Sequence, residues 1–282
     1  MSPTLRAALW MTGTIAAFST MAIAGRELSS DLDTFEIMLY RSVVGFLIVC
    51  LLATAFQDWA AITRQALGLH VLRNMAHFTG QNLWFFAVTV IPLAQVFALE
   101  FTSPIWVLVL SPFLLGEKVT STRILAAFMG FVGILLIVRP GAQAIDLGAM
   151  AAASSALFFA LSIIMTKYLT RTQSITNILF WLTLMQLVMG LICAGYDGRI
   201  AAPSASTAPW LVLIGIAGLA AHYCLTSALS LAPATLVVPM DFIRLPVIAL
   251  IGALVYGEAL DLWVLIGALI IFTGNYINLS RR

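Results

Sequence analysis

Charged side chains inside long apolar stretches are the residues of this sequence best suited to chemistry. Glu100 and Asp241 lie in two such stretches, Arg41 lies in a third, and Arg244 follows Asp241 by three positions. A charge at membrane depth costs about 3 kcal/mol or more, so each of these side chains needs a partner or a role. Asp241 and Arg244 could neutralise each other one helical turn apart, or could hold the two charges of a zwitterionic molecule. Either carboxylate could instead carry a proton across the bilayer.

Two histidines and a glutamine form a second polar group. His77 and Gln81 are four positions apart, so their side chains share one face of a helix, and His222 lies in a separate apolar stretch. We expect His77, Gln81 and His222 to bind a substrate where these two faces converge. Each histidine could also carry a coupled proton, and a buried, hydrogen-bonded structural histidine is the alternative interpretation.

Three pairs of aromatic residues are separated by the same interval of 141 positions. The pairs are Phe18 with Phe159, Tyr40 with Trp181, and Phe101 with Phe242. Aromatic rings could line a cavity for a bulky apolar substrate, or they could pack within the protein. We predict that Tyr40, Phe101, Phe159 and Trp181 line a substrate cavity.

The composition indicates which environment must hold these residues. Of the 282 residues, 62% are hydrophobic and only 9% are charged, too few to cover a surface that faces water. Lipid is therefore the expected solvent, and the net charge of +2 without a basic run gives no indication of nucleic-acid binding. The sequence contains no nucleotide-binding P-loop, no metal or redox spacing of cysteines and no hydrolase motif. We expect neither enzyme activity nor a cofactor or metal.

Ten apolar segments are long enough to cross a bilayer core about 30 Å thick. They are approximately Leu5 to Ala24, Phe35 to Thr54, Val71 to Val90, Leu93 to Leu115, Thr120 to Val138, Leu147 to Met165, Ile175 to Ala194, Pro209 to Leu231, Ala234 to Tyr256 and Leu260 to Leu279. Pro92 and Pro233 each permit a tight reversal between two of these segments. The predicted fold class is an all-α integral membrane protein.

The same interval of 141 positions relates the two halves of the chain without gaps. It pairs Pro92 with Pro233, Glu100 with Asp241, Gly116-Glu117 with Gly257-Glu258, and Gly133 with Gly274. The sequence therefore predicts two five-helix repeats, residues 1–141 and 142–282. Gly116 and Gly257 are expected to stop a helix, and the acid after each is expected at the N-terminus of the next helix.

Lysine and arginine predict the orientation of the helices. With both termini in the cytoplasm, nine cations lie on that side: Arg6, Arg64, Arg73, Lys118, Arg123, Lys167, Arg171, Arg281 and Arg282. Three lie outside: Arg26, Arg139 and Arg199. This distribution follows the positive-inside rule. Since five is odd, the second repeat must enter the membrane from the side opposite to the first, which makes these inverted-topology repeats.

Inverted repeats are typical of secondary transporters, whose sites lie where corresponding helices are interrupted by proline or glycine. The fourth segment contains Pro104 and Pro112, and the ninth contains Pro239 and Pro246. We expect these two segments to shape the site. The alternative is that the prolines only kink the bundle.

The ten segments in two halves, the arginine within Tyr40-Arg41-Ser42 and the two Gly-Glu pairs resemble the EamA-type drug/metabolite transporter family. Over the whole chain, this resemblance implies transport across a bacterial inner membrane, commonly export of amino acids and related metabolites. Within the family, the chain is similar to bacterial exporters of aromatic amino acids.

We therefore expect a secondary transporter that exports amino acids, preferably aromatic or other bulky neutral ones, by alternating access. The alternative is proton-coupled efflux of hydrophobic cations, drugs or other small metabolites. The expected partners are a small-molecule substrate and the lipid bilayer. The sequence leaves the oligomeric state open and is compatible with a monomer.

Overall fold

A computed structural model shows an all-helical bundle over its described residues, which are 1–28, 31–91, 93–138, 146–256 and 262–280. Its elements are α1 (Pro3–Leu28), α2 (Thr34–Ala55), η1 (Asp58–Ala61), α3 (Leu67–Val90), α4 (Leu93–Glu100), α5 (Ser103–Leu115), α6 (Ser121–Val138), α7 (Leu147–Leu169), α8 (Ile175–Ala194), α9 (Ala208–Leu231), α10 (Ala234–Val237), η2 (Val238–Ile243), α11 (Arg244–Tyr256) and α12 (Leu262–Ser280).

The ten predicted membrane segments correspond to these helices. Among the described residues, seven segments are long and apolar enough to cross a membrane by length and composition: Pro3–Gly25, Thr34–Ala55, Leu147–Leu169, Ile175–Ala194, Ala208–Leu231, Ala234–Val255 and Leu262–Ser280. The helices α5 and α6 are shorter and apolar. The 24-residue helix α3 is more polar because it carries His70, Asn74, His77 and Gln81, all of which are buried. The prediction of a multi-pass, all-α membrane protein is confirmed.

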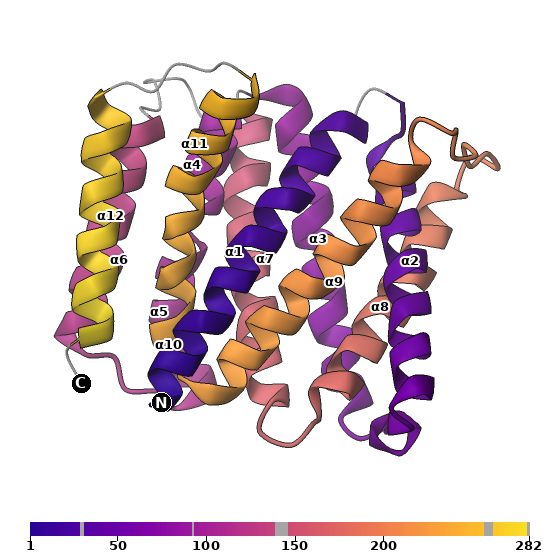
Figure 1. Ribbon diagram of the computed structural model, residues 1–282, viewed down its shortest axis with the longest axis horizontal. Coiled ribbons are helices and arrows are strands. Elements are labelled where there is room, and N and C mark those ends of the chain that lie inside the picture. Colours follow the sequence, from indigo (N-terminus) through magenta and orange to yellow (C-terminus); the bar gives the residue numbers. More distant parts are fainter. Residues whose placement is uncertain (29–30, 92, 139–145, 257–261, 281–282) are drawn as a thin grey trace.

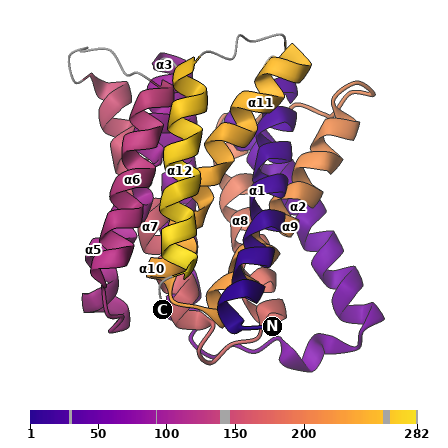
Figure 2. The ribbon, with the colours of Figure 1, turned by 60° about the vertical axis from the view of Figure 1, so that its left-hand side comes forward.

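The two halves are interleaved in the bundle. The helix α1 of the first half packs along α9 of the second, and the equivalent pair, α7 of the second half with α3 of the first, packs in the same way. On either side, α2 packs against its own equivalent α8, and α6 packs against its own equivalent α12 (Figures 1 and 2). Both chain ends lie at the same end of the bundle in Figure 1, as an even number of crossings requires. Equivalent helices therefore run in opposite directions.

Two of the ten crossings are interrupted, and they are the two that contain the predicted prolines. The fourth crossing breaks after Glu100, between α4 and α5, with Pro104 in the first turn of α5. The ninth changes from α-helix to 3₁₀-helix over Val238–Ile243, a segment that contains Pro239. Proline removes a backbone donor, which favours a break in the helix. Both intramembrane carboxylates lie at these breaks, Glu100 at the last residue of α4 and Asp241 within η2.

Candidate substrate cavity

A cavity of about 740 Å³ lies between the two repeats. The volume is within the range of 300–1,000 Å³ typical of small-molecule sites. Its lining includes side chains from α1, α2, α3, α7, α9 and α11 and from both interrupted crossings. The exposed Asp33, just before α2, lines the cavity at the end of the bundle opposite the termini. None of the described residues in the connections 56–66, 116–120 and 170–174, at the other end, lines it. The cavity therefore opens away from the termini.

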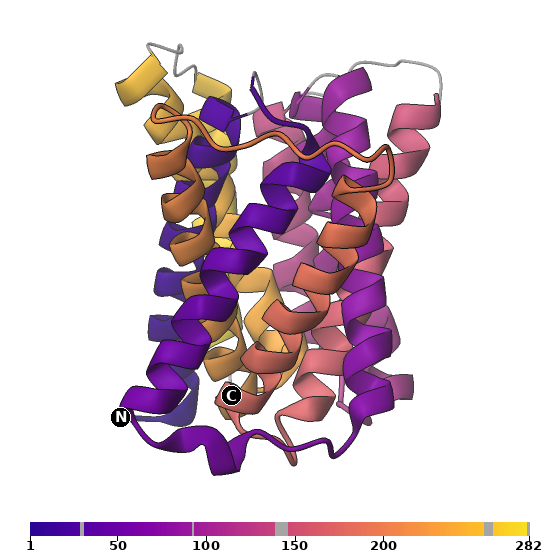
Figure 3. The same cartoon turned by 90° about the vertical axis from the view of Figure 1, so that its right-hand side faces the viewer.

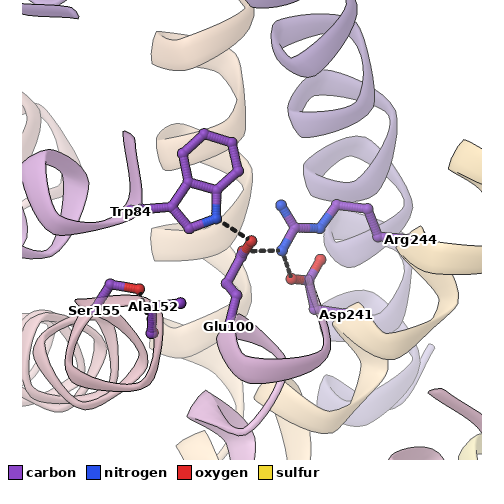
Figure 4. A network of polar contacts seen from close by, with 6 residues as sticks. All are labelled: Trp84, Glu100, Ala152, Ser155, Asp241 and Arg244. Atoms are coloured by element: carbon purple, nitrogen blue, oxygen red, sulfur yellow. Dashed lines mark hydrogen bonds and ion pairs between the residues drawn. The ribbon is translucent and has the colours of Figure 1, made fainter. Parts of the chain in front are cut away.

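The two equivalent carboxylates share one arginine at the cavity wall (Figure 4). Arg244 Nη2 lies 2.9 Å from Glu100 Oε1 and 2.9 Å from Asp241 Oδ2. The indole nitrogen of Trp84 donates to the second oxygen of Glu100 at 2.7 Å, and the guanidinium of Arg244 lies over the rings of Phe18 and Phe101. Two acids and one base give this cluster a formal charge of −1. Asp241 Oδ1 and Arg244 Nε are buried and have no hydrogen-bond partner among the residues that the structure describes.

A second polar group, on α2, α3 and α8, is basic. With the Gln81 amide oriented to satisfy its neighbours, Gln81 accepts from Nη1 and Nη2 of Arg41 at 2.9 Å each and donates to Gln186 at 3.1 Å. Gln186 in turn donates to the carbonyl of Asn74 at 3.1 Å. Among the described residues, Arg41 has no carboxylate partner, although only 9% of its surface is exposed. This buried guanidinium is therefore held by the amide of Gln81 and, at 3.7 Å, by the sulfur of Met21.

The two predicted histidines contact each other beside Arg41. The rings of His77 and His222 meet edge to face with centroids 4.9 Å apart. His77 also packs against Phe159 in a tilted arrangement, and His222 packs edge to face against Phe18. Phe18 and Phe159 are equivalent residues of the two repeats, so the histidine pair lies between two symmetry-related rings. The Nε2 atom of each histidine is buried and has no hydrogen-bond partner within the described chain.

The structure brings together seven of the residues predicted for the site. Those that line the cavity are His77, Gln81, Glu100, Phe159, His222, Asp241 and Arg244. Phe101 is buried behind the wall, where it contacts its own equivalent Phe242 with ring centroids 6.2 Å apart. The pseudo-twofold axis of the repeats therefore passes between these two rings. The substrate-binding role of all these residues stays a prediction.

Tyr40 and Trp181, which are also predicted for the site, lie outside the cavity lining. Tyr40 donates from its hydroxyl to the carbonyl of Ala201 at 2.6 Å, and Trp181 donates from its indole to the carbonyl of Thr63 at 2.8 Å. These carbonyls belong to the connections between α8 and α9 and between α2 and α3, at opposite ends of the bundle (Figure 3). The equivalent pair thus anchors two loops.

The same two loops are held at their amide groups. Glu36 accepts from the backbone N–H of Ala201 at 2.6 Å, and its equivalent Asn177 accepts from that of Thr63 at 3.0 Å. Each loop residue is therefore fixed at both its N–H and its carbonyl by two side chains one helical turn apart. We call these two arrangements, Glu36–Tyr40 on Ala201 and Asn177–Trp181 on Thr63, the loop anchors.

Sequence reasoning did not place Arg73 in the site. The charge distribution places Arg73 among the cytoplasmic cations. In the structure it lies within α3, is 2% exposed and lines the cavity. Its Nε donates to Thr166 and its Nη1 donates to Asn74. The spacing of four positions before His77 could have identified it, because i and i+4 share a helix face. Arg41, which the sequence marks as a charged residue at membrane depth but not as a site residue, also lines the cavity.

The end of the bundle that holds the termini is closed by contacts between the repeats. Gly116 ends α5 with φ of 68°, as expected of a glycine stop. Glu117 differs from the expectation, because it caps α10 of the other repeat and not the next helix. It accepts from the N–H groups of Ala234 and Thr235 at 2.8 and 3.1 Å and from the Thr235 hydroxyl at 2.8 Å. Its equivalents Gly257 and Glu258 lie outside the described residues.

Comparison with known proteins assigns the family. The EamA-like transporter family matches residues 5–139 and 146–280, that is, once in each half. The chain therefore belongs to the EamA-like transporter family and is a membrane transporter, not an enzyme. The boundary predicted between residues 141 and 142 falls between these two matches and lies outside the described residues.

The names of individual relatives refer to different substrates. The chain is 34% identical to the riboflavin transporter of Brucella anthropi over 203 residues, which cover 71% of this chain and 72% of that one. It is 22% identical to the S-adenosylmethionine uptake transporter of Rickettsia bellii, over 93% and 89% of the two chains. A crystal structure with a TM-score of 0.83 and 18% identity, covering 96% and 95% of the two chains, has the same fold.

Proposed function

We propose that this protein is an uptake transporter for riboflavin or a closely related flavin and that it works by alternating access of its two repeats. The observation that carries this proposal is the composition of the cavity. It is large enough for a tricyclic ring with a side chain, and both repeats contribute aromatic rings and polar groups to it. The similarity to the Brucella anthropi riboflavin transporter supports the same substrate.

The aromatic lining suits a flat ring system. Phe18, Trp84, Phe85, Phe97 and Phe159 all line the cavity. Stacked and edge-to-face contacts with planar rings contribute about 0.5–1.5 kcal/mol each beyond burial of their area. A flavin offers such a ring together with carbonyl groups and a hydroxylated chain, which match the polar groups between the aromatic residues.

The proposed direction is into the cell. We place both termini in the cytoplasm, from the distribution of cations, and the described cavity then opens to the outside. The name of the Rickettsia bellii relative also includes uptake. This direction is opposite to the export expected from the sequence resemblance.

Export of aromatic amino acids is the second candidate, because one observation favours it. The cavity holds the guanidinium of Arg41, which has no carboxylate partner within the described ranges, and, elsewhere, an acidic cluster with a formal charge of −1. These could bind the carboxylate and the ammonium of a zwitterion. Efflux of hydrophobic cations has less support, because Arg244 already neutralises part of the Glu100 and Asp241 charge.

The test is counterflow in liposomes that contain purified protein. We expect saturable exchange of labelled riboflavin, competed by unlabelled riboflavin and absent from protein-free liposomes. Phenylalanine, tryptophan, S-adenosylmethionine and tetraphenylphosphonium are tested in parallel. Exchange of an amino acid without riboflavin would replace the proposed substrate by the second candidate, and non-saturable flux would indicate a channel. Uptake into cells that cannot synthesise riboflavin then measures the direction.

A further inference from the structure

The charges around the cavity are unevenly distributed. One group, Glu100, Asp241 and Arg244, is held together by ion pairs and has a formal charge of −1. The other contains Arg41 and Arg73, and neither has a carboxylate partner among the residues that the structure describes. A buried charge without a counter-charge is costly, so the basic group is incomplete without a bound molecule.

Arg41 is held in a defined orientation. Its two terminal nitrogens donate to a single oxygen of Gln81, and Nη1 also lies 3.7 Å from the sulfur of Met21. A guanidinium has five N–H donors. These contacts occupy three of them, which leaves the Nε donor and one Nη2 donor of Arg41 without a partner among the described residues. Gln81 is fixed in turn by Gln186, so the orientation of the guanidinium is set before a substrate arrives.

Neighbouring polar atoms of two histidines also have no hydrogen-bond partner in the part of the chain that the structure describes. His77 and His222 are 8% and 6% exposed, and the Nε2 atom of each lacks a hydrogen bond. An unpaired buried polar atom costs about 1–3 kcal/mol, which a ligand recovers by bonding to it. The rings of Phe18 and Phe159 lie against these histidines and would flank a planar molecule.

We infer that Arg41 is the docking group for the carbonyl-bearing edge of the substrate ring, with the hydroxylated chain directed toward Asp241. This inference rests on the proposed function. The pyrimidinedione edge of a flavin presents a carbonyl oxygen beside an unprotonated ring nitrogen, and these two adjacent acceptors match the two free donors of Arg41. The free oxygen of Asp241 can accept a hydrogen bond from a hydroxyl group of the hydroxylated chain, and the free Nε of Arg244 can donate one to another. Gln81 is a positioning residue that acts through Arg41.

The two ends of the substrate are tested separately with lumichrome, which has the ring system without the hydroxylated chain. Binding to purified protein is measured by quenching of flavin or lumichrome fluorescence. We expect Arg41→Gln to weaken the binding of riboflavin and of lumichrome alike, by about tenfold or more. Arg41→Lys keeps the positive charge but loses the paired N–H donors of the guanidinium, so it should give an intermediate loss of affinity. Asp241→Asn should weaken riboflavin binding and leave lumichrome binding within twofold of the unmodified protein.

Three controls make the outcomes distinct. Arg64→Gln removes an exposed loop arginine outside the cavity and should change neither affinity. Gln81→Leu keeps Arg41 but releases its orientation, so it should weaken lumichrome binding even if Arg41→Gln does not fold. If the unmodified protein neither binds nor exchanges riboflavin, the proposed function is wrong. If it does both and folded Arg41→Gln and Gln81→Leu bind lumichrome normally, only the docking inference is overturned.

Discussion

Glu117 of the first repeat accepts hydrogen bonds from both the backbone N–H and the hydroxyl of Thr235 in the second repeat, at 3.1 and 2.8 Å. Arg123 donates to the same hydroxyl at 2.6 Å. Nearby, Lys167 donates to the carbonyls of Leu229 and Ala232. The Lys167 contacts lie within the second repeat, whereas those of Glu117 and Arg123 join the two repeats at the end where the cavity is closed. In an alternating-access cycle the contacts between the repeats must separate when that end opens.

Replacing the carboxylate of Glu117 should therefore favour opening at the closed end. We expect Glu117→Ala to destabilise the described state by about 1 kcal/mol, the usual cost of losing a helix cap. The measurement is labelling of a cysteine introduced at Ser103, which lines the cavity, by a membrane-impermeant thiol reagent from the side of the termini. Labelling should be faster in the variant. Asp197→Asn, in an exposed loop at the other end, is the matched control, and equal labelling rates would contradict the assignment.

The loop anchors predict two variants with matching effects. Tyr40→Phe and Trp181→Phe each remove one hydrogen bond to a loop carbonyl, which contributes about 1 kcal/mol. Because neither side chain lines the cavity, both variants should melt at a lower temperature and keep the half-saturation concentration for riboflavin. If the half-saturation concentration changed while the melting temperature did not, both residues would instead contact the substrate, as the sequence predicts.

The cluster around Arg244 predicts a non-additive set of variants. Arg244→Ala leaves Glu100 and Asp241 without their shared counter-charge and should destabilise the protein by about 3–5 kcal/mol. Replacing all three groups together, as Glu100→Gln, Asp241→Asn and Arg244→Met, removes the unpaired charges and should restore much of the melting temperature. Transport need not return. A triple variant less stable than Arg244→Ala would show that packing, not charge pairing, dominates there.

The close approach of α6 and α12 depends on glycine. A Cβ atom added at Gly133 would lie 2.7 Å from the carbonyl oxygen of Gly267, and one added at Gly267 would lie 2.6 Å from that of Gly133. Such distances force the helices apart, so Gly133→Ala should lower the melting temperature. Gly68→Ala is the control, because a Cβ there meets no heavy atom within 4 Å and favours the helix. Equal melting temperatures for the two variants would be inconsistent with the described packing.

Proton coupling provides a further prediction. Glu100, Asp241, His77 and His222 are the candidates, and the histidine pair faces Arg41, Arg73 and the aromatic rings. If these histidines carry the proton, an acidic exterior should drive riboflavin accumulation in the unmodified protein, since protons then enter with it. The double variant His77→Gln, His222→Gln should lose this accumulation and keep counterflow. Accumulation that persists would assign coupling to a carboxylate, and none in the unmodified protein would indicate uncoupled transport.

Much of the architecture could be predicted from the sequence because the bilayer restricts the possible structures. Apolar length predicts the crossings, the ungapped interval predicts the inverted repeats, and Pro104 and Pro239 predict the two interrupted helices. The pairing of Glu100 with Arg244 was harder to predict from the sequence, because Asp241 lies only three positions from Arg244 and was the expected partner. Residues on separate helices meet only through tertiary packing, which residue spacing does not specify.

The site residues show where such reasoning ends. Helical spacing placed His77 and Gln81 on one face of α3, and the same spacing would have added Arg73. By contrast, Tyr40 and Trp181 have the residue types of a substrate cavity but lie where α2 and α8 meet the loops of the other repeat. Residue type alone cannot distinguish a ring that contacts substrate from one that holds a loop.

The interleaving of the two halves has a consequence for how such a chain can be divided or assembled. The principal neighbours of α1, α2, α3 and α6 all belong to the second half. A single half would therefore expose most of its buried face and could complete the bundle only by binding a second five-helix chain inserted in the opposite direction. One half expressed alone would need an antiparallel partner, and carrying both halves in one chain supplies the two orientations in equal numbers.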